Sequence, residues 1–133
     1  LWLTGKNLYT AAMYNVRAEF FNPDYKLFVW WQGENDTNDT DMTNAYQQNF
    51  RDIFEDEKTF VGKSVLHYVD IELSDDNGAG YPTINTAKAT NVAYYGDANY
   101  IPVNDFNQGI HASAAQMEIV GQRIFDQVKD LWK

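Results

Sequence analysis

The sequence predicts a single α/β domain in which helices cover a parallel sheet. The chain has 133 residues, 44% of them are hydrophobic, and segments with a helical period alternate with short apolar runs typical of strands. A chain of this length and composition can bury one core. Strands that are separated by helices usually pair in parallel, because a helix is the common crossover between parallel strands.

The first half of the chain contains a helical, a strand and a second helical pattern. Apolar residues recur every four positions within residues 6–21, which predicts an amphipathic helix that ends before Pro23. The apolar run from Lys26 to Gln32 predicts a buried strand. Residues 42–54 again show a helical period. The residues predicted to face inward from this helix are Met42, Tyr46, Phe50, Ile53 and Phe54.

The second half continues the alternation. Residues 64–73 and 99–103 have the composition of strands. A helix between them begins near Pro82, because proline is tolerated in a first helical turn. A last helix begins at Ala114, where Ser113 and Gln116 match the pattern of a capping box. Its predicted inward face consists of Met117, Val120, Ile124, Val128 and Leu131. The predicted order is α-β-α-β-α-β-α.

The charge of the chain excludes some classes of partner. There are 19 acidic and 10 basic side chains, which gives a formal net charge of −9. Such a field repels phosphates, so we expect neither nucleic-acid binding nor association with an anionic membrane. The apolar runs are too short to span a bilayer. Cysteine is absent, which excludes disulfides, thiolate metal sites and a cysteine nucleophile.

Two polar loops carry residues suited to chemistry. In a parallel sheet, functional residues lie beyond the carboxyl ends of the strands, and the loops Gln32 to Asp41 and Asn104 to Ser113 both follow predicted strands. In the first loop, Gly33 permits a tight turn, and amide side chains can donate to an oxyanion without adding charge. In the second loop, His111 precedes a helix, which favours a neutral imidazole that can act as a general base. The alternatives are an ordinary polar connection and a solvent-exposed histidine.

Together these loops resemble the SGNH (GDSL-type) hydrolases, in particular the branch of sialate O-acetylesterases and acetylxylan esterases. The run from Gly33 to Asp36 matches the superfamily's Gly-x-Asn-Asp block, and Trp31 to Asp36 is similar to the branch's Trp-x-Gln-Gly-Glu-Ser-Asp. The run Gly109 to Gln116, with Gly-Gln-Arg-Ile at 121–124, resembles the block of the catalytic histidine. The resemblance spans roughly residues 26 to 128, and it implies a flavodoxin-like, three-layer α/β/α sandwich.

The resemblance implies a serine esterase that removes acetyl groups from carbohydrate. His111 would be the general base, and Asn35 would donate to the oxyanion. Gln32, Gly33 and Glu34 would form the oxyanion and substrate pocket. No metal and no cofactor is implied.

Two features depart from the family pattern. The nucleophilic serine should lie in a Gly-Asp-Ser or Gly-Gln-Ser motif upstream, and none of Ser64, Ser74 and Ser113 has that context. Residues 1–133 are therefore expected to be the C-terminal portion of one SGNH domain, with the N-terminal strands and the nucleophile loop missing and supplied by a preceding part of the same domain.

The second departure lies beside the histidine. Gln108 stands three residues before His111, where the family has aspartate to orient the imidazole. A neutral amide can hold a tautomer but cannot stabilise an imidazolium. Asp105 or Glu34 are alternative partners for the histidine, and a Ser–His dyad is a further arrangement.

Three other interpretations remain open at this stage. Loss of catalysis would leave a carbohydrate-binding or structural module, such as a piece of a phage tail or surface assembly. For the protein in general, an extracellular or virion-associated location is slightly favoured. A glycosidase would use Glu34 with Asp36 or Asp105. A calcium loop would use Asp36, Asn38 and Thr40, but the glycine and glutamate of an EF-hand are replaced, so a helix N-cap explains this segment better.

Overall fold

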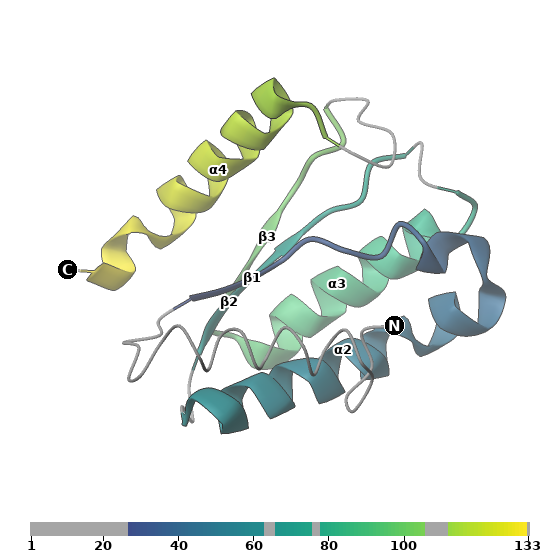
Figure 1. Ribbon diagram of the computed structural model, residues 1–133, viewed down its shortest axis with the longest axis horizontal. Helices are drawn as coiled ribbons and strands as arrows, with labels where there is room; N and C mark the ends of the chain where they lie inside the picture. The colour runs from purple at the N-terminus through teal and green to yellow at the C-terminus, as the bar shows by residue number, and fades with distance from the viewer. Residues whose placement is uncertain (1–26, 63–65, 76–77, 106–111, 133) are drawn as a thin grey trace.

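The computed structural model describes residues 27–62, 66–75, 78–105 and 112–132 (Figure 1). The helix predicted for residues 6–21 lies outside these described residues. In the described part, three strands form one sheet in the order β1-β2-β3. The strands are β1 (Leu27–Trp30), β2 (His67–Ile71) and β3 (Ala98–Ile101). Both pairings are parallel, as predicted, and Val69 in the centre pairs with Val29 on one side and Asn99 on the other.

Helices connect the strands and cover both faces of the sheet. The helices are α2 (Thr40–Val61), α3 (Tyr81–Tyr95) and α4 (Ala114–Val128), with a short 3-10 segment η2 (Lys129–Trp132) after α4. Figure 1 shows α2 and α3 side by side on one face of the sheet and α4 on the other. This arrangement confirms the predicted α/β/α sandwich. Within the described ranges, no helix combines the length and the hydropathy needed to span a bilayer.

The hydrophobic core is divided by the sheet. On the α4 face, buried aliphatic side chains of β2 and β3 pack against Val120 and Val128. On the other face, an aromatic cluster fills the space between the sheet and α2. Its buried and partly buried members include Phe28, Trp30, Phe50, Phe54, Tyr68 and Tyr95. Alternate residues of each strand thus meet different helices, as expected for a sheet that is covered on both faces.

Three expectations about burial were wrong. β1 was predicted to be buried, but Val29 is 43% exposed, because β1 is at one end of the described sheet and the buried part of the core on the α4 face comes from the chain of β2 and β3. Met42 and Met117 were predicted to face inward, yet they are 49% and 55% exposed. Both lie in the first turn of their helix. The helical period predicts which face is apolar but does not say where along its length a helix meets the sheet.

The central strand carries a buried ion pair. Asp70 of β2 and Lys88 of α3 are both 0% exposed, and Lys88 Nζ lies 2.5 Å from Asp70 Oδ1. The hydroxyl of Tyr68 donates to the other carboxylate oxygen, and Lys88 Nζ also lies 5.4 Å from the centre of the Tyr46 ring of α2. Burial by itself would lower the pKa of Lys88, but the Asp70 carboxylate outweighs burial and raises it to about 12. The ammonium group therefore stays charged at neutral pH.

Replacing Lys88 by methionine should strongly destabilise the protein. The change leaves the Asp70 carboxylate buried without its counter-charge, which costs about 3–5 kcal/mol of unfolding free energy, whereas the double variant Lys88→Met/Asp70→Leu should recover much of that loss. Lys58→Met is the matched control, because Lys58 pairs with the exposed carboxylate of Glu55 and its replacement should cost less than about 1 kcal/mol. Urea unfolding measures these differences. Equal losses for Lys88→Met and Lys58→Met would contradict the prediction.

A second buried ionisable group, the carboxyl group of Glu57, lacks an ion-pair partner among the described residues. Glu57 of α2 is 2% exposed, and its Oε2 has no hydrogen-bond partner among the described residues. Burial raises the pKa of this carboxyl group. A raised pKa means that the folded state binds the proton more tightly than the unfolded state. The contribution of Glu57 to stability is therefore lost as the pH rises through the folded-state pKa.

Glu57→Gln should flatten part of this pH dependence. The glutamine cannot ionise. The free energy of unfolding of the variant should therefore increase relative to that of the wild type as the pH rises from about 4 to about 7. Glu55→Gln serves as the control, because Glu55 is exposed on the same helix. Denaturant unfolding at several pH values gives both differences. A Glu57→Gln difference that stays constant with pH would show that this carboxyl group does not titrate with folding.

Candidate active site

The candidate site lies at one edge of the sheet. Because the three strands are parallel, their carboxyl ends meet at the same edge. Connections leave this edge after Trp30, Ile71 and Ile101, and Figure 1 shows them at the same end of the sheet. Both loops predicted to carry chemistry therefore begin at the edge where ligands bind in open parallel sheets. The strand order places the connection after β2 between them.

The first loop turns sharply at Gly33. The carbonyl oxygen of Gly33 accepts from the backbone N–H groups of Asp36 (2.9 Å) and Thr37 (3.2 Å), which leads directly into the 3-10 segment η1 (Asp36–Asn38). Gly33 has a φ of 137°. A Cβ atom there would lie 3.1–3.2 Å from side-chain atoms of Leu73, Ile84 and Tyr46. Both the backbone conformation and the close packing therefore require glycine.

The hydroxyl of Tyr46 holds the residue before this turn. It donates to the carbonyl oxygen of Gln32 (2.7 Å) and accepts from Trp30 Nε1 (3.0 Å). Burial raises the pKa of Tyr46 to about 12, although Lys88 acts in the opposite direction, so the hydroxyl remains protonated and can donate. The side chain of Gln32 is also fixed, because its Nε2 donates to Asp36 Oδ2 at 3.2 Å.

Glu34 and Asn35 lie at the outer side of the same turn. The carbonyl oxygen of Glu34 accepts from the hydroxyl of Thr37 (2.7 Å), which fixes the backbone, while the Glu34 side chain is half-buried. Asn35 is exposed and precedes η1 without capping it through its side chain. The loop therefore presents a carboxylate and a carboxamide on a backbone that is fixed by hydrogen bonds from the hydroxyl groups of Thr37 and Tyr46.

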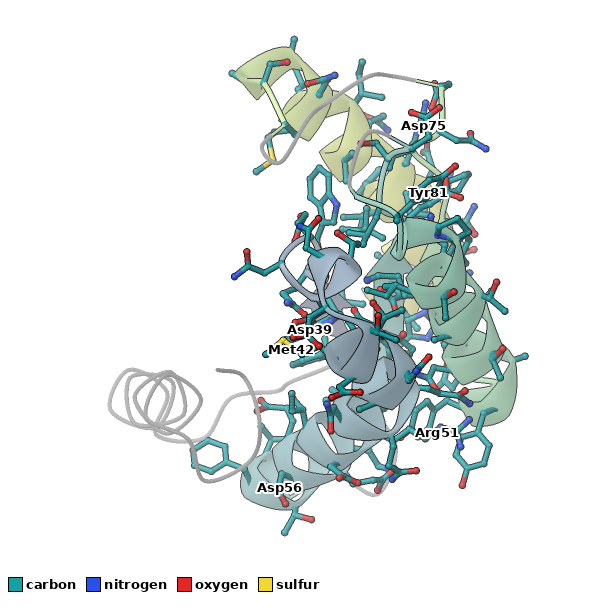
Figure 2. The ribbon with its side chains drawn as sticks, turned by 90° about the vertical axis from the view of Figure 1, so that its right-hand side faces the viewer. Asp39, Met42, Arg51, Asp56, Asp75 and Tyr81 are labelled. Atoms are coloured by element: carbon teal, nitrogen blue, oxygen red, sulfur yellow. The ribbon has the colours of Figure 1, made fainter. Side chains whose placement is uncertain are left out.

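Asp39, at the end of this loop, is the N-cap of α2. Its Oδ1 accepts from the backbone N–H of Met42 at 2.9 Å, and Figure 2 shows the two residues beside each other at the start of the helix. This confirms the N-cap interpretation of the acidic segment. Within the described ranges, no group of three or more histidine, aspartate or glutamate side chains is arranged to hold a metal ion.

The second loop is described only at its two ends. At the first end, Asp105 accepts from Arg123 of α4 through both carboxylate oxygens, at 2.8 and 2.5 Å. This bonding with Arg123 holds the pKa of Asp105 below its usual value. At the other end, Ser113 and Gln116 form the predicted capping box of α4. Gln108 and His111 lie outside the described residues, so their predicted roles stay predictions.

The structure brings together part of the predicted site. Gln32 and Asp36 are bonded to each other within the first loop, whereas no hydrogen bond between described residues joins Asp105 to that loop. Two of the three serines are described, and both have structural positions. Ser74 is fully buried, and Ser113 accepts from the backbone N–H of Gln116 as the cap of α4.

Sequence reasoning missed three residues that shape this edge. Tyr46 was predicted only as an apolar core residue, and its hydroxyl contacts depend on the tertiary structure. Glu72 directly follows β2 and binds backbone N–H groups of the second loop. An acidic residue immediately after an apolar strand is a signal that could have found it. Arg123 was noted as part of a sequence block, but its bond to Asp105 was not predicted.

Comparisons with known proteins agree with this arrangement. The fold is an α/β sandwich, and its candidate site lies beyond the carboxyl ends of the parallel strands. The profile of the family described as carbohydrate esterase, sialic acid-specific acetylesterase, matches residues 1–130. The chain belongs to this family.

Structural similarity extends to an X-ray structure of a protein from Arabidopsis thaliana. The match has a TM-score of 0.81 at 14% sequence identity and covers 98% of this chain. It covers 55% of the plant protein, so the chain spans about half the length of that structure. At this identity the similarity supports the fold alone. A search of curated proteins finds no match.

Replacing Gly33 by alanine should disturb the first loop far more than a comparable change elsewhere. Gly62→Ala is the matched control, because Gly62 also has a positive φ (68°) but has open space around its Cβ position. The control should cost about 1 kcal/mol of backbone strain, whereas Gly33→Ala should cost at least about 2 kcal/mol more, since three side chains must move. Chemical unfolding measures both. Similar losses at the two glycines would show that the contacts beneath Gly33 are not tight.

Proposed function

We propose that this chain supplies the histidine and substrate-loop portion of a carbohydrate O-acetylesterase of the SGNH type. Membership in a carbohydrate esterase family supports the reaction class. The observation that carries the proposal is the edge of the sheet, from which the tightly turned Gln32–Asp36 loop and the chain leading to His111 both depart. The nucleophilic serine is expected from the preceding part of the same domain.

In the proposed reaction, the serine hydroxyl attacks the acetyl carbonyl carbon while His111 accepts its proton. The carbonyl oxygen becomes an oxyanion, to which the Asn35 carboxamide and backbone N–H groups donate. The bond from the acyl carbon to the sugar oxygen then breaks, and the histidine returns the proton to that oxygen. Water repeats the sequence on the acetyl-serine and releases acetate.

Five residues are proposed to orient His111 or to line the pocket beside it. Gln108 would hold the imidazole tautomer through its neutral amide, and either Asp105 or Glu34 would be the carboxylate that stabilises the imidazolium. Gln32, Gly33 and Glu34 would form the wall of the pocket that contacts the acetylated sugar. The net charge of −9 suits a neutral sugar ester better than a polyanion.

His111→Ala in the full-length protein should abolish hydrolysis of p-nitrophenyl acetate. A loss of at least about 10³-fold in kcat/KM is expected, because the serine loses its base. His67→Gln is the matched control. His67 lies at the start of β2, at the opposite edge of the sheet, and bonds to Asp97 and Asn99 there. It should therefore lower stability without abolishing turnover.

The two histidine variants also separate this proposal from a non-catalytic carbohydrate-binding module. A binding module would show no turnover that depends on His111, and full activity of His111→Ala would overturn the esterase assignment. Measurement of acetate released from acetylated xylan and acetylated sialic acid then identifies the substrate class.

A further inference from the structure

The segment Pro102–Asp105 connects β3 to the loop that contains Gln108 and His111. In the structure this short segment is bound from two different elements by side chains of opposite charge. The carboxylate of Glu72, directly after β2, accepts hydrogen bonds from two backbone N–H groups of the segment. The guanidinium of Arg123, on α4, donates to a backbone carbonyl oxygen and to a side-chain carboxylate of the segment. Neither Glu72 nor Arg123 is among the residues proposed above to act in catalysis or to contact the substrate.

Glu72 holds the backbone where the strand becomes the loop. Its Oε2 accepts from the N–H of Val103 at 2.8 Å and from the N–H of Asn104 at 3.1 Å. Hydrogen bonds from backbone N–H groups to a carboxylate are charge-assisted and stronger than neutral ones. The backbone N–H of Glu72 donates to the carbonyl oxygen of Ile101 at 2.9 Å, so the residue continues the register between β2 and β3.

Tyr100 lies near enough to the same carboxylate for its charge to act on the phenol. Burial, followed by the charge of the Glu72 carboxylate, raises the pKa of Tyr100. The hydroxyl therefore stays protonated and remains a donor. Glu72 thus accepts hydrogen bonds from the second and third residues after β3, which fixes the backbone where the chain leaves the sheet.

Arg123 binds the other side of the segment. Its guanidinium donates to the carbonyl oxygen of Pro102 at 2.5 Å and to both carboxylate oxygens of Asp105. The fork of a guanidinium matches a carboxylate in two parallel bonds and so fixes orientation as well as distance. Asp105 is exposed, so the ion pair contributes little to overall stability, and its effect is to fix geometry.

The far end of the loop is fixed to the same helix that carries Arg123. Ser113 accepts from the N–H of Gln116, and the Gln116 side chain accepts from the N–H of Ser113 at 2.7 Å. Only residues 106–112 lie between Asp105 and Ser113. Arg123 and the capping box of α4 thus hold the described residues on both sides of this stretch.

We propose that Glu72 and Arg123 are positioning residues that anchor the base of the His111 loop and thereby place the histidine for catalysis. This inference rests on the proposed function. The bonds between Arg123 and Asp105 are part of this anchor. Displacement of a catalytic group by about 1 Å can cost roughly 10²-fold in rate, which sets the size of the expected effect.

Kinetics of the full-length protein with p-nitrophenyl acetate test the positioning. Glu72→Ala should lower kcat by about 10- to 100-fold and leave KM nearly unchanged, because the loss affects the transition state rather than binding. Glu72→Gln should retain more activity than Glu72→Ala, since its amide oxygen still accepts hydrogen bonds. Arg123→Lys should behave like Arg123→Ala, because lysine cannot form the fork.

Asn99→Ala is the matched control. Asn99 lies on the same strand β3, at the end away from the loop, and bonds to His67 and Gln127. Its removal should lower stability to a similar degree while kcat is unchanged. If Asn99→Ala and Glu72→Ala lower kcat equally, the effect is one of stability and the proposal is wrong.

Hydrogen exchange of peptides covering residues 103–113 provides a readout that does not need activity. Faster exchange in Glu72→Ala and Arg123→Ala, but not in Asn99→Ala, is expected from a loosened loop base. Unchanged exchange overturns the anchoring whatever the kinetics show. If the wild type hydrolyses no ester, the proposed function fails by itself, and exchange alone then decides whether these residues anchor the loop.

Discussion

Asp70 and Lys88 lie fully buried between the central strand and α3, where neither charge would be tolerated without the other. Their ion pair joins β2 to α3, and the Lys88 ammonium also lies 5.4 Å from the centre of the Tyr46 ring of α2. The hydroxyl of Tyr46 donates to the carbonyl oxygen of Gln32. This network of contacts therefore connects the sheet, both helices of one layer and the backbone of the candidate site. Because buried polar groups are costly when unpaired, this network favours a single packing of the layer.

The rigidity of the first loop follows from this network. The backbone at Gln32 is held by Tyr46, and at Gly33 the chain turns onto Leu73, Ile84 and Tyr46 with no room for a side chain. Glu34 and Asn35 are thus exposed or half-exposed side chains on a backbone that is fixed by buried groups. Such support is what a site needs when its donors must be placed before a substrate arrives.

The sequence predicted those features that depend on local pattern. The alternation of helices and strands, the parallel sheet and the capping box at Ser113 are each encoded within a short stretch of chain, and the structure confirms them. The pairing of Asp70 with Lys88 depends on two distant elements, although a charged residue on each apolar face was a visible signal. The exposure of Val29 was missed because an apolar run does not reveal whether its strand has neighbours on both sides. The roles of His111 and Gln108 remain predictions.

The order of the strands explains how two distant loops come to share one support. The connection after β2 lies between the other two, and its first residues, Glu72 and Leu73, contact one loop each. The Glu72 carboxylate binds the chain after β3, whereas Leu73 packs against Gly33 in the chain after β1. Asn85 of α3 fixes Leu73 in turn, through hydrogen bonds to both its N–H (2.9 Å) and its carbonyl oxygen (2.8 Å). A shift of this connection would therefore move the described parts of both loops together, so the middle strand sets where each of them starts.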